Sequence, residues 1–241
     1  MSGSVERNYS GMKKKCVQLS GRLKLIASFV SDGSRLADIG TDHGYVPIYL
    51  VGKGIIPSAI AMDINEGPLK KAEENVKMFD LEDKILLRLS DGLDKLSSKE
   101  ADTVLIAGMG GRLIVNILDR GKAVCDKINE LILSPHSEIE LVREYLMNNG
   151  FAVVREEMIL DEGKYYTIMK AVHGTMEYSG MEELLYGKLL LENKDKVLKE
   201  YLLKEKSKYN DILSKLSGNP VNAIKSKIHV IDRALNRYKQ I

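Results

Sequence analysis

The chain has 241 residues, of which 44% are hydrophobic and 29% are charged, and its formal net charge is +2. This composition excludes a disordered tail, and 20 glycines against 5 prolines exclude collagen-like and proline-rich chains. No run approaches the ~18 apolar residues of a membrane span, and residues 1–15 lack the apolar segment of a signal peptide. We therefore expect a cytoplasmic protein with no membrane contact.

Short apolar runs, which predict strands, alternate with amphipathic stretches, which predict helices, over the first two-thirds of the chain. Strands are expected at 35–40, 59–64, 85–91, 103–109, 130–135, 151–160 and 165–172, and helices at 21–30, after Gly44, at 66–79, at 111–121 and at 137–150. The last two strands form a hairpin across 161–164. The alternation predicts an α/β fold with a Rossmann-like seven-stranded sheet.

From about Met181 onward the pattern is purely helical. Apolar residues recur at a four-three spacing from Leu184 to Leu216 and again from Ile224 to Leu235, with a break at 218–220. This predicts one long helix or two nearly collinear ones, then a helix packed antiparallel on the first. We therefore divide the chain into a Rossmann-like domain, residues 1–175, and a coiled-coil-like helical hairpin, residues 176–241.

The helical segment also differs in charge, because residues 176–241 hold 13 Lys and Arg against 9 Asp and Glu. A basic excess of this size fits contact with phosphates and fits a solvated surface equally well. The candidates for RNA contact are Arg22, Arg112, Lys204, Lys206 and Lys208.

The two cysteines, Cys16 and Cys125, lie far apart and neither belongs to a metal-ligand spacing. We expect two reduced thiols. The pattern excludes zinc and disulfide scaffolds, and no metal is expected.

The first predicted strand runs into Asp38, Gly40, Asp42 and Gly44, which have the glycine rhythm of a nucleotide-binding loop. A dinucleotide fold needs glycine beside the pyrophosphate at the position of Asp42. A carboxylate there repels a diphosphate and suits a ligand with an ammonium or sulfonium group, such as S-adenosylmethionine. The loop therefore favours a methyl donor over NAD.

Three further strand ends carry acids or glycines at the same edge of the sheet, where open parallel sheets bind ligands. Asp63 ends the second strand at the spacing from which an acid reaches ribose hydroxyls, and Asp91 ends the third strand, where it could accept a hydrogen bond from an adenine amine. The fourth strand ends in AGMGG, residues 107–111, whose glycines let the backbone pass close to a cofactor or an acceptor base. Four such ends together favour cofactor binding over simple turns. The expected cofactor-binding residues are Asp38, Gly40, Asp42, Gly44, Tyr45, Asp63, Ile64, Asp91, Gly92, Ala107, Gly108 and Met109.

These segments together resemble the bacterial tRNA (adenine(22)-N1)-methyltransferase family. The similarity lies in LSGRLKLIASFV, RLADIGTDHGYVPIYLV, AMDIN, AGMGG and EEMILDEGKYYTIMKA, and it covers roughly residues 19–172. The resemblance implies a Rossmann-like class I methyltransferase fold with a C-terminal helical domain. It also implies S-adenosylmethionine as donor and N1 of adenine 22 in the D-arm region of tRNA as acceptor. One departure is Ser134-Pro135-His136, where the family would have something close to Gln-Pro-Asn, and it leaves the base contacts open.

N1 of neutral adenine carries an in-plane lone pair, so its methylation needs no prior deprotonation and positioning dominates. The product is cationic, and Asp42 either stabilises that charge or holds the ammonium of the donor. The catalytic candidates are Asp42, His43, Met109 and His136, with the histidines orienting the base and the 108–111 loop shaping its slot. His173 and His229 are interpreted as surface residues.

Two alternatives stay open: a catalytically inactive RNA-binding protein with the same fold, and a small-molecule methyltransferase that dimerises through its helical hairpin. The intact acids of the cofactor loops argue against the first, and the basic C-terminal segment argues against the second. We expect a monomer with tRNA as its partner, and a dimer is the alternative state.

Overall fold

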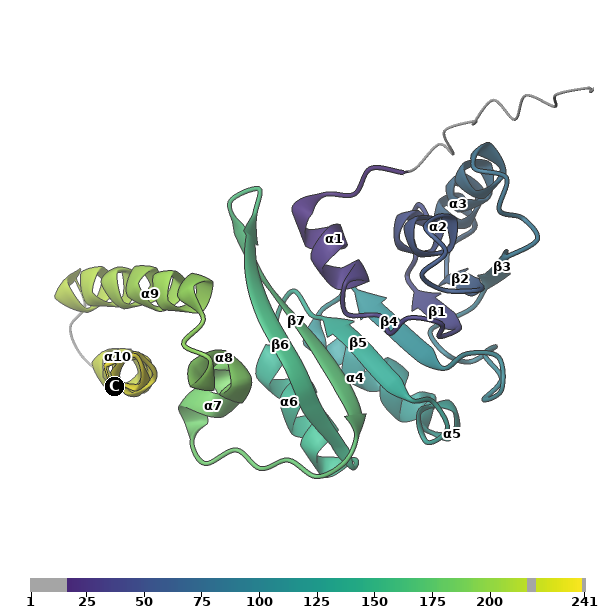
Figure 1. Ribbon diagram of the computed structural model, residues 1–241. Helices are drawn as coiled ribbons and strands as arrows, with labels where there is room; N and C mark the ends of the chain where they lie inside the picture. Colours follow the sequence, from purple (N-terminus) through teal and green to yellow (C-terminus); the bar gives the residue numbers. More distant parts are fainter. Residues whose placement is uncertain (1–16, 216–219, 240–241) are drawn as a thin grey trace, which may run out of the picture.

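The computed structural model describes residues 17–215 and 220–239, and its centre is one seven-stranded sheet (Figure 1). The strand order is β3-β2-β1-β4-β5-β7-β6. All seven strands predicted from the sequence are confirmed. They are β1 Leu36–Ile39, β2 Ala59–Asp63, β3 Ile85–Leu89, β4 Thr103–Ala107, β5 Glu130–Ser134, β6 Phe151–Asp161 and β7 Lys164–His173.

The first five strands pair in parallel, and β7 lies antiparallel between β5 and β6. The turn between β6 and β7 is tight because Glu162 and Gly163 both adopt positive φ, as the predicted hairpin requires. The strand order reverses at β1, which pairs with β2 on one side and β4 on the other. Such a switch point opens a crevice beyond the carboxyl ends of the strands.

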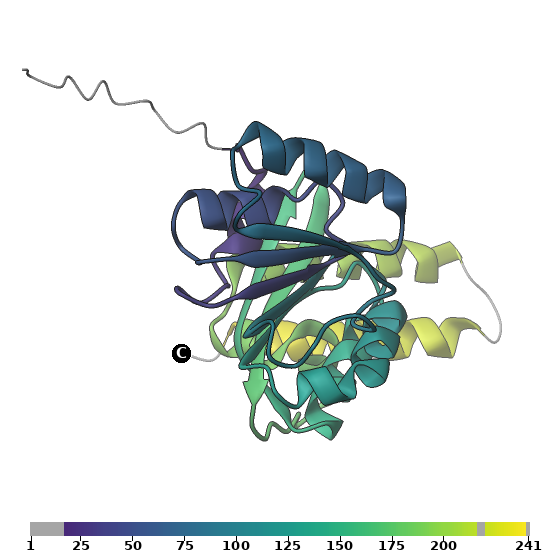
Figure 2. The same cartoon turned by 90° about the vertical axis from the view of Figure 1, so that its right-hand side faces the viewer.

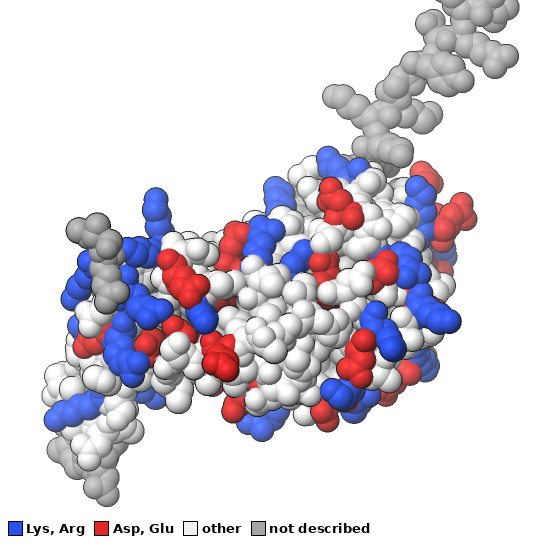
Figure 3. Space-filling view, turned by 60° about the horizontal axis from the view of Figure 1, so that its bottom comes forward, with Lys and Arg blue, Asp and Glu red and all other residues white. Residues whose placement is uncertain are grey.

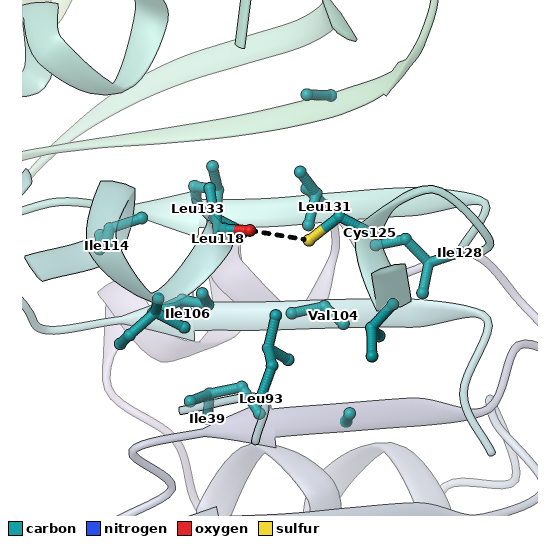
Figure 4. Packing of buried hydrophobic residues seen from close by; sticks show 14 of the residues in the cluster. Ile39, Leu93, Val104, Ile106, Ile114, Leu118, Cys125, Ile128, Leu131 and Leu133 are labelled. Carbon is teal, nitrogen blue, oxygen red and sulfur yellow. Dashed lines mark hydrogen bonds between the residues drawn. The ribbon is translucent and has the colours of Figure 1, made fainter. Parts of the chain in front are cut away.

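Helices cover both faces of the sheet and bury two separate apolar clusters (Figures 1 and 2). One cluster lies under α1, α2 and α3, and the other lies under α4, α5 and α6 (Figure 4). Sequence analysis missed only the short α5 in this part of the chain. The bounds are α1 Gly21–Ala27, α2 Tyr45–Gly52, α3 Glu66–Met78, α4 Gly111–Arg120, α5 Lys122–Cys125 and α6 Ile139–Asn148.

Cys125 is a free thiol buried in the second cluster, where its Sγ lies 3.7 Å from the carbonyl oxygen of Leu118 (Figure 4). Burial raises the pKa of this thiol to about 11, so it stays protonated and unreactive at neutral pH. Cys16 lies outside the described residues.

The C-terminal segment consists of α7 Met181–Tyr186, α8 Lys188–Glu192, α9 Lys196–Lys215 and α10 Pro220–Arg237. The expectation of one long helix or two nearly collinear ones is wrong, because this stretch forms three helices, α7, α8 and α9. The chain breaks where Gly187 adopts a φ of 96° and Lys194 a φ of 51°. The antiparallel packing of α9 and α10 is confirmed (Figure 2). Leu198 and Leu202 of α9 are buried in one apolar cluster with Ile231 of α10. Leu216 and the break at 218–219 lie outside the described residues.

A buried ion pair joins this segment to the sheet. Arg143 of α6 and Glu156 of β6 lie 2.6 Å apart, and each side chain is 1% exposed. Arg143 Nη1 also donates to the carbonyl oxygens of Leu184 and Leu185 in α7, at 2.8 and 2.9 Å. The sheet is complete before α7, yet Arg143 of α6, which packs on the sheet, makes two of its hydrogen bonds with α7.

Within residues 17–215 and 220–239, no helix is long and apolar enough to cross a bilayer.

Candidate active site

Two adjoining cavities, of about 270 and 420 Å³, open beyond the carboxyl ends of the parallel strands. They share a wall because residues at or just after the carboxyl ends of β1, β2 and β4 line both cavities. The shared residues are Gly40, Asp63, Asn65, Ala107 and Gly108. The site thus has two adjoining compartments, each large enough for part of a ligand.

The smaller cavity combines acids with exposed apolar side chains. Ile64 after β2 is 59% exposed and Leu113 of α4 is 49% exposed, and both line this cavity. Asp91 lines it as well, but its carboxylate pairs with Arg120 at 3.0 Å. Exposed apolar side chains beside acids suit a ligand with a flat apolar part and several hydroxyl or amine donors.

Asp38 and Asp63, at the ends of neighbouring strands, are buried at 6% and 8% exposure. Thr41 Oγ1 donates to Asp38 Oδ2 at 2.6 Å, and the backbone N–H of Asn65 donates to Asp63 Oδ1 at 2.9 Å. Within the described residues no further hydrogen bond reaches either carboxylate. One oxygen of each acid therefore remains available to a ligand donor.

Burial raises the pKa of Asp38 to about 7, and the negative charge of Asp63 adds to the rise, while the hydrogen bond from Thr41 opposes it. Two carboxylates that share a crevice are destabilised unless a donor or a cation lies between them. The pair therefore favours a ligand that brings a positive charge or hydrogen-bond donors.

Gly40 lets the side chain of Met109 lie against the backbone of the first loop. Its φ is 73°, and a Cβ at this position would collide with Met109 Cε. Met109 thereby forms part of the wall of the smaller cavity. Gly44 lines neither cavity; it caps α2, where a Cβ would crowd Ala72 of α3 at 3.3 Å.

The larger cavity is lined by three of the catalytic candidates, Asp42, His43 and His136, and by Tyr45. Asp42 has a positive φ of 53°, and its side chain is 67% exposed. Its Oδ2 lies 3.5 Å from His43 Nε2, and the His43 ring stacks on Tyr45 at 5.2 Å between centroids. Asp42 is thus a carboxylate at the mouth of the cavity and not a buried base.

His136 also lines the larger cavity and is held by three contacts. Its backbone N–H donates to Met109 O at 2.8 Å, Arg22 Nη1 lies 3.2 Å from its Nε2, and its ring lies 5.5 Å from that of Tyr166. Burial lowers the pKa of His136, and the charges of Arg22 and Lys164 lower it further. The imidazole is therefore neutral at neutral pH, and its Nε2 accepts the hydrogen bond from the guanidinium.

The loop 134–136 reaches the cavity only through its last residue. Ser134 and Pro135 are buried, whereas His136 is exposed and lines the larger cavity. The departure seen in the sequence therefore places a histidine in the lining of the larger cavity.

The residues predicted to contact RNA differ in their surroundings. Arg22 lines the larger cavity, with its guanidinium 4.8 Å from the centroid of the Tyr166 ring. Arg112 lines neither cavity and pairs with Glu138 at 3.1 Å. Arg22 therefore belongs to the site, whereas Arg112 is an exposed residue beside it.

The three lysines lie on α9. Basic side chains lie among acidic ones on the surface at the helical end of the molecule (Figure 3). Lys204 donates to the Tyr165 hydroxyl at 2.7 Å, Lys206 pairs with Asp232 of α10 at 2.6 Å, and Lys208 lies 5.8 Å from the Tyr209 ring. Lys206 therefore holds the two helices together, and an RNA contact of these lysines stays a prediction.

Sequence analysis missed several residues of the site. Thr41 and Asn65 lie three and two residues after the strand-end acids Asp38 and Asp63, so this short spacing could have revealed them. Tyr166 belongs to a tyrosine doublet in the last strand, and only the hairpin brings it beside α1. Leu113 and Ile117 lie on an amphipathic helix, whose pattern does not reveal that part of the apolar face lines a cavity.

Among the described residues no cluster of His, Cys, Asp or Glu could hold a metal ion.

Comparison with known proteins agrees with this geometry. Residues 19–169 match a family model described as a methyltransferase domain, so the chain belongs to the methyltransferases built on a Rossmann-like sheet. It is also 36% identical to the tRNA (adenine(22)-N(1))-methyltransferase of Bacillus subtilis (strain 168) over 186 residues, which cover 75% of this chain and 78% of that protein. The chain is therefore a member of the bacterial tRNA (adenine(22)-N1)-methyltransferase family.

Two solved structures extend the similarity into the helical segment. Streptococcus pneumoniae Sp1610 in complex with S-adenosyl-L-methionine is 36% identical with a TM-score of 0.84, covering 90% of this chain and all of that one. Mycoplasma capricolum TrmK in complex with S-adenosyl-homocysteine is 30% identical with a TM-score of 0.81, covering 91% of this chain and 98% of that one. The predicted fold and family are both confirmed.

Proposed function

We propose that the protein transfers the methyl group of S-adenosylmethionine to N1 of adenine 22 in the D-arm region of tRNA. The observation that carries this proposal is the pair of adjoining cavities, one bounded by acids and apolar side chains and the other by Arg22, His43 and His136. A methyl donor and an acceptor base must meet at such a junction. Membership of the tRNA (adenine(22)-N1)-methyltransferase family supports the choice of acceptor.

The residues of the smaller cavity fit the donor. The donor supplies a methyl group bonded to a positively charged sulfur. The open oxygen of Asp63 would accept hydrogen bonds from the ribose hydroxyls, and Ile64 and Leu113 would contact the faces of the adenine ring. Asp38, at the wall of the larger cavity, would face the ammonium group, which compensates a carboxylate that burial otherwise disfavours.

The residues of the larger cavity would position the acceptor. The target base must leave its stack to enter the cavity, and the His43 and Tyr45 rings offer a surface for it. Arg22, held over Tyr166 and against His136, would contact the neighbouring phosphate. Asp42 would lower the energy of the positive charge that develops on the base, without receiving a proton.

Incubation with S-adenosylmethionine and unmodified tRNA transcripts, followed by nucleoside mass spectrometry, tests the proposal. We expect 1-methyladenosine among the nucleosides. Primer extension on the same tRNA should show a reverse-transcription stop caused by a modification at position 22. Asp63→Ala is expected to lose most of this product at limiting donor, whereas Asp83→Ala, an exposed acid outside both cavities, keeps it. Absence of 1-methyladenosine with the parent protein, or its appearance at another position, would overturn the proposal.

We also propose that the enzyme is a cytoplasmic monomer. A single chain supplies every wall of both cavities described above, so catalysis does not require a second copy. Sedimentation equilibrium is expected to give the mass of one chain at micromolar concentration. A mass of two chains that persists on dilution would contradict it.

A further inference from the structure

A groove of about 450 Å³ separates the sheet from the C-terminal helices. Its walls come from the 136–140 segment, α6, β6, β7, α7, α9 and α10. It shares His136 with the larger cavity of the active site, so the groove and that cavity lie on either side of one residue. Its volume lies in the range of about 300 to 1,000 Å³ that small ligands occupy. The tyrosines that line it are Tyr165, Tyr186, Tyr201 and Tyr209.

Buried polar contacts fix the walls of the groove. Arg143 lines it and ties α6 both to Glu156 of β6 and to the carbonyl oxygens of α7. Tyr165 of β7 and Tyr201 of α9 meet edge to face across it, with ring centroids 5.1 Å apart. The groove is therefore preformed, and binding there orders few additional side chains.

The chemistry of the lining favours an unstacked nucleobase. Aromatic rings are the surfaces on which proteins stack bases of single-stranded RNA. Glu140 and Glu205 also line the groove and provide carboxylate oxygens for the amino group of a base. Burial raises the pKa of Tyr201, and the charge of Glu205 raises it further, so its hydroxyl stays protonated.

Basic side chains lie on the tyrosine hydroxyls of the groove. Lys204 Nζ lies 2.7 Å from the Tyr165 hydroxyl, and Lys227 Nζ lies 3.5 Å from that of Tyr209. Both lysine residues are exposed to solvent. Cations beside aromatic rings and carboxylates match a nucleotide, whose phosphate is anionic and whose base is neutral.

We propose that this groove binds a second unstacked nucleobase of the RNA substrate, one that bears an amino group and lies within a few nucleotides of the target adenine. The proposal rests on the proposed function, because the shared His136 places the groove beside the cavity assigned to the target base. The target adenine enters one side of His136 and the second base enters the other. The C-terminal helices thereby form half of a base-binding site and act as more than a basic surface.

Filling the groove tests this assignment. Ser226 is an exposed residue of α10 that lines the groove, and Ser226→Trp places an indole in it. The matched control is Ser207→Trp on α9: Ser207 is exposed and lies two residues, about 200° around the helix, from the lining residues Glu205 and Tyr209. Thermal denaturation checks that both variants fold.

We expect Ser226→Trp to weaken binding of a fluorescently labelled tRNA transcript about tenfold or more, with unchanged calorimetric affinity for the donor. Ser207→Trp is expected to stay within twofold of the parent. A set of transcripts, each with a single abasic nucleotide near the target, identifies the second base. One of these transcripts is expected to bind the parent protein about tenfold more weakly than the intact transcript does. The same transcript should bind Ser226→Trp no more weakly than the intact transcript binds that variant.

Equal RNA affinities for the two tryptophan variants would overturn the proposal. A Ser226→Trp variant that differs from the parent only in its sedimentation mass would also overturn it, because the groove would then be a contact between two copies of the chain. The binding assay also separates this inference from the proposed function. Loss of RNA binding in Ser226→Trp would support the groove even if the parent protein formed no 1-methyladenosine, which would contradict the methylation proposal alone.

Discussion

The two edges of the sheet treat buried acids in opposite ways. At the carboxyl edge, Asp38 and Asp63 each receive one hydrogen bond from the described residues. At the amino edge, Glu130 of β5 accepts from the backbone and side chain of Ser31, from Thr103 and from Lys170, all at 2.7 to 2.9 Å. The same sheet therefore holds carboxylates with open acceptor capacity at one edge and a fully bonded one at the other.

The pKa values follow this difference. Burial raises the pKa of Asp38 to about 7 because Thr41 alone offsets it. Burial also acts to raise the pKa of Glu130, but Lys170, Ser31 and Thr103 together outweigh it, and the pKa lies below its usual value. A buried acid whose partners are all internal stabilises the fold, whereas a buried acid with an open oxygen is prepared for a ligand.

The largest expected effect is on the amino edge. Glu130→Gln leaves Lys170 without its charged partner and should lower the free energy of unfolding at pH 7 by about 3 kcal/mol or more. Donor affinity should not change, because Glu130 lies at the far edge of the sheet. Urea denaturation and calorimetry measure the two quantities, and the exposed Glu82→Gln is the control. A variant as stable as the parent would break the comparison.

Asp38 should respond to pH in the opposite direction from a stabilising carboxylate. Its pKa rises from an ordinary 3.8 to about 7 in the folded protein. The folded state therefore binds the proton more tightly, so this contribution to stability is complete below about pH 4 and is lost as pH rises through 7.

Asp38→Asn removes that titration and keeps the acceptor for Thr41. Without donor, the variant should be about 1 to 4 kcal/mol more stable than the parent at pH 8, and the advantage should vanish near pH 4. Urea denaturation at several pH values measures this, with Asp83→Asn as the exposed control. If the free energy of unfolding changed with pH in the same way for parent and variant, burial would not raise the pKa of Asp38.

Asp63→Ala should weaken donor binding by about 1.5 to 3 kcal/mol, the usual value of hydrogen bonds to a charged group. Thermal stability should change little, because the carboxylate has only the Asn65 N–H as a partner among the described residues. Isothermal titration with S-adenosylmethionine decides the matter. Unchanged affinity would show that another residue contacts the ribose and that the open oxygen of Asp63 does not bind the donor.

The smallest effect is expected at Asp42, which is exposed and therefore well screened. Asp42→Asn should lower kcat less than tenfold, with a modest rise in the KM for donor, because the reaction needs no proton acceptor there. Single-turnover methylation at saturating donor and tRNA measures it. Complete loss of turnover with both affinities intact would show that Asp42 takes a proton in the reaction.

Hydrophobic periodicity predicted every strand and placed the acids of Asp38, Asp63 and Asp91 at strand ends, because parallel strands bring those ends to one edge. The number of open oxygens on each acid was not predictable, since it depends on donors such as Thr41 and Asn65 whose direction only the fold determines. Arg22 illustrates the same limit. Its contacts with His136 and Tyr166 join segments that are distant in sequence, and no local pattern reports them.

The C-terminal segment was predicted less well for a different reason. Its four-three spacing continues through Gly187, whose positive φ ends α7, so periodicity alone could not reveal the break. The attachment of α7 depends on Arg143, which a sequence pattern assigns to an ordinary exposed helix position. Buried arginines are rare, and their partners become visible only in three dimensions.

The attachment of α7 through Arg143 has a consequence for exchanging parts between relatives. The guanidinium binds the main-chain oxygens of Leu184 and Leu185, so it recognises the path of the chain and ignores which side chains α7 carries. This anchor leaves the side chains of Leu184 and Leu185 open to substitution, whereas the buried Glu182 and Glu183 of α7 pair with Arg233 and Arg237 of α10 at 3.0 and 2.8 Å. In a chimera joined after Gly187, the Arg143 anchor would therefore accept α7 from either parent, but the transplanted C-terminal helices would have to bring both arginines with them.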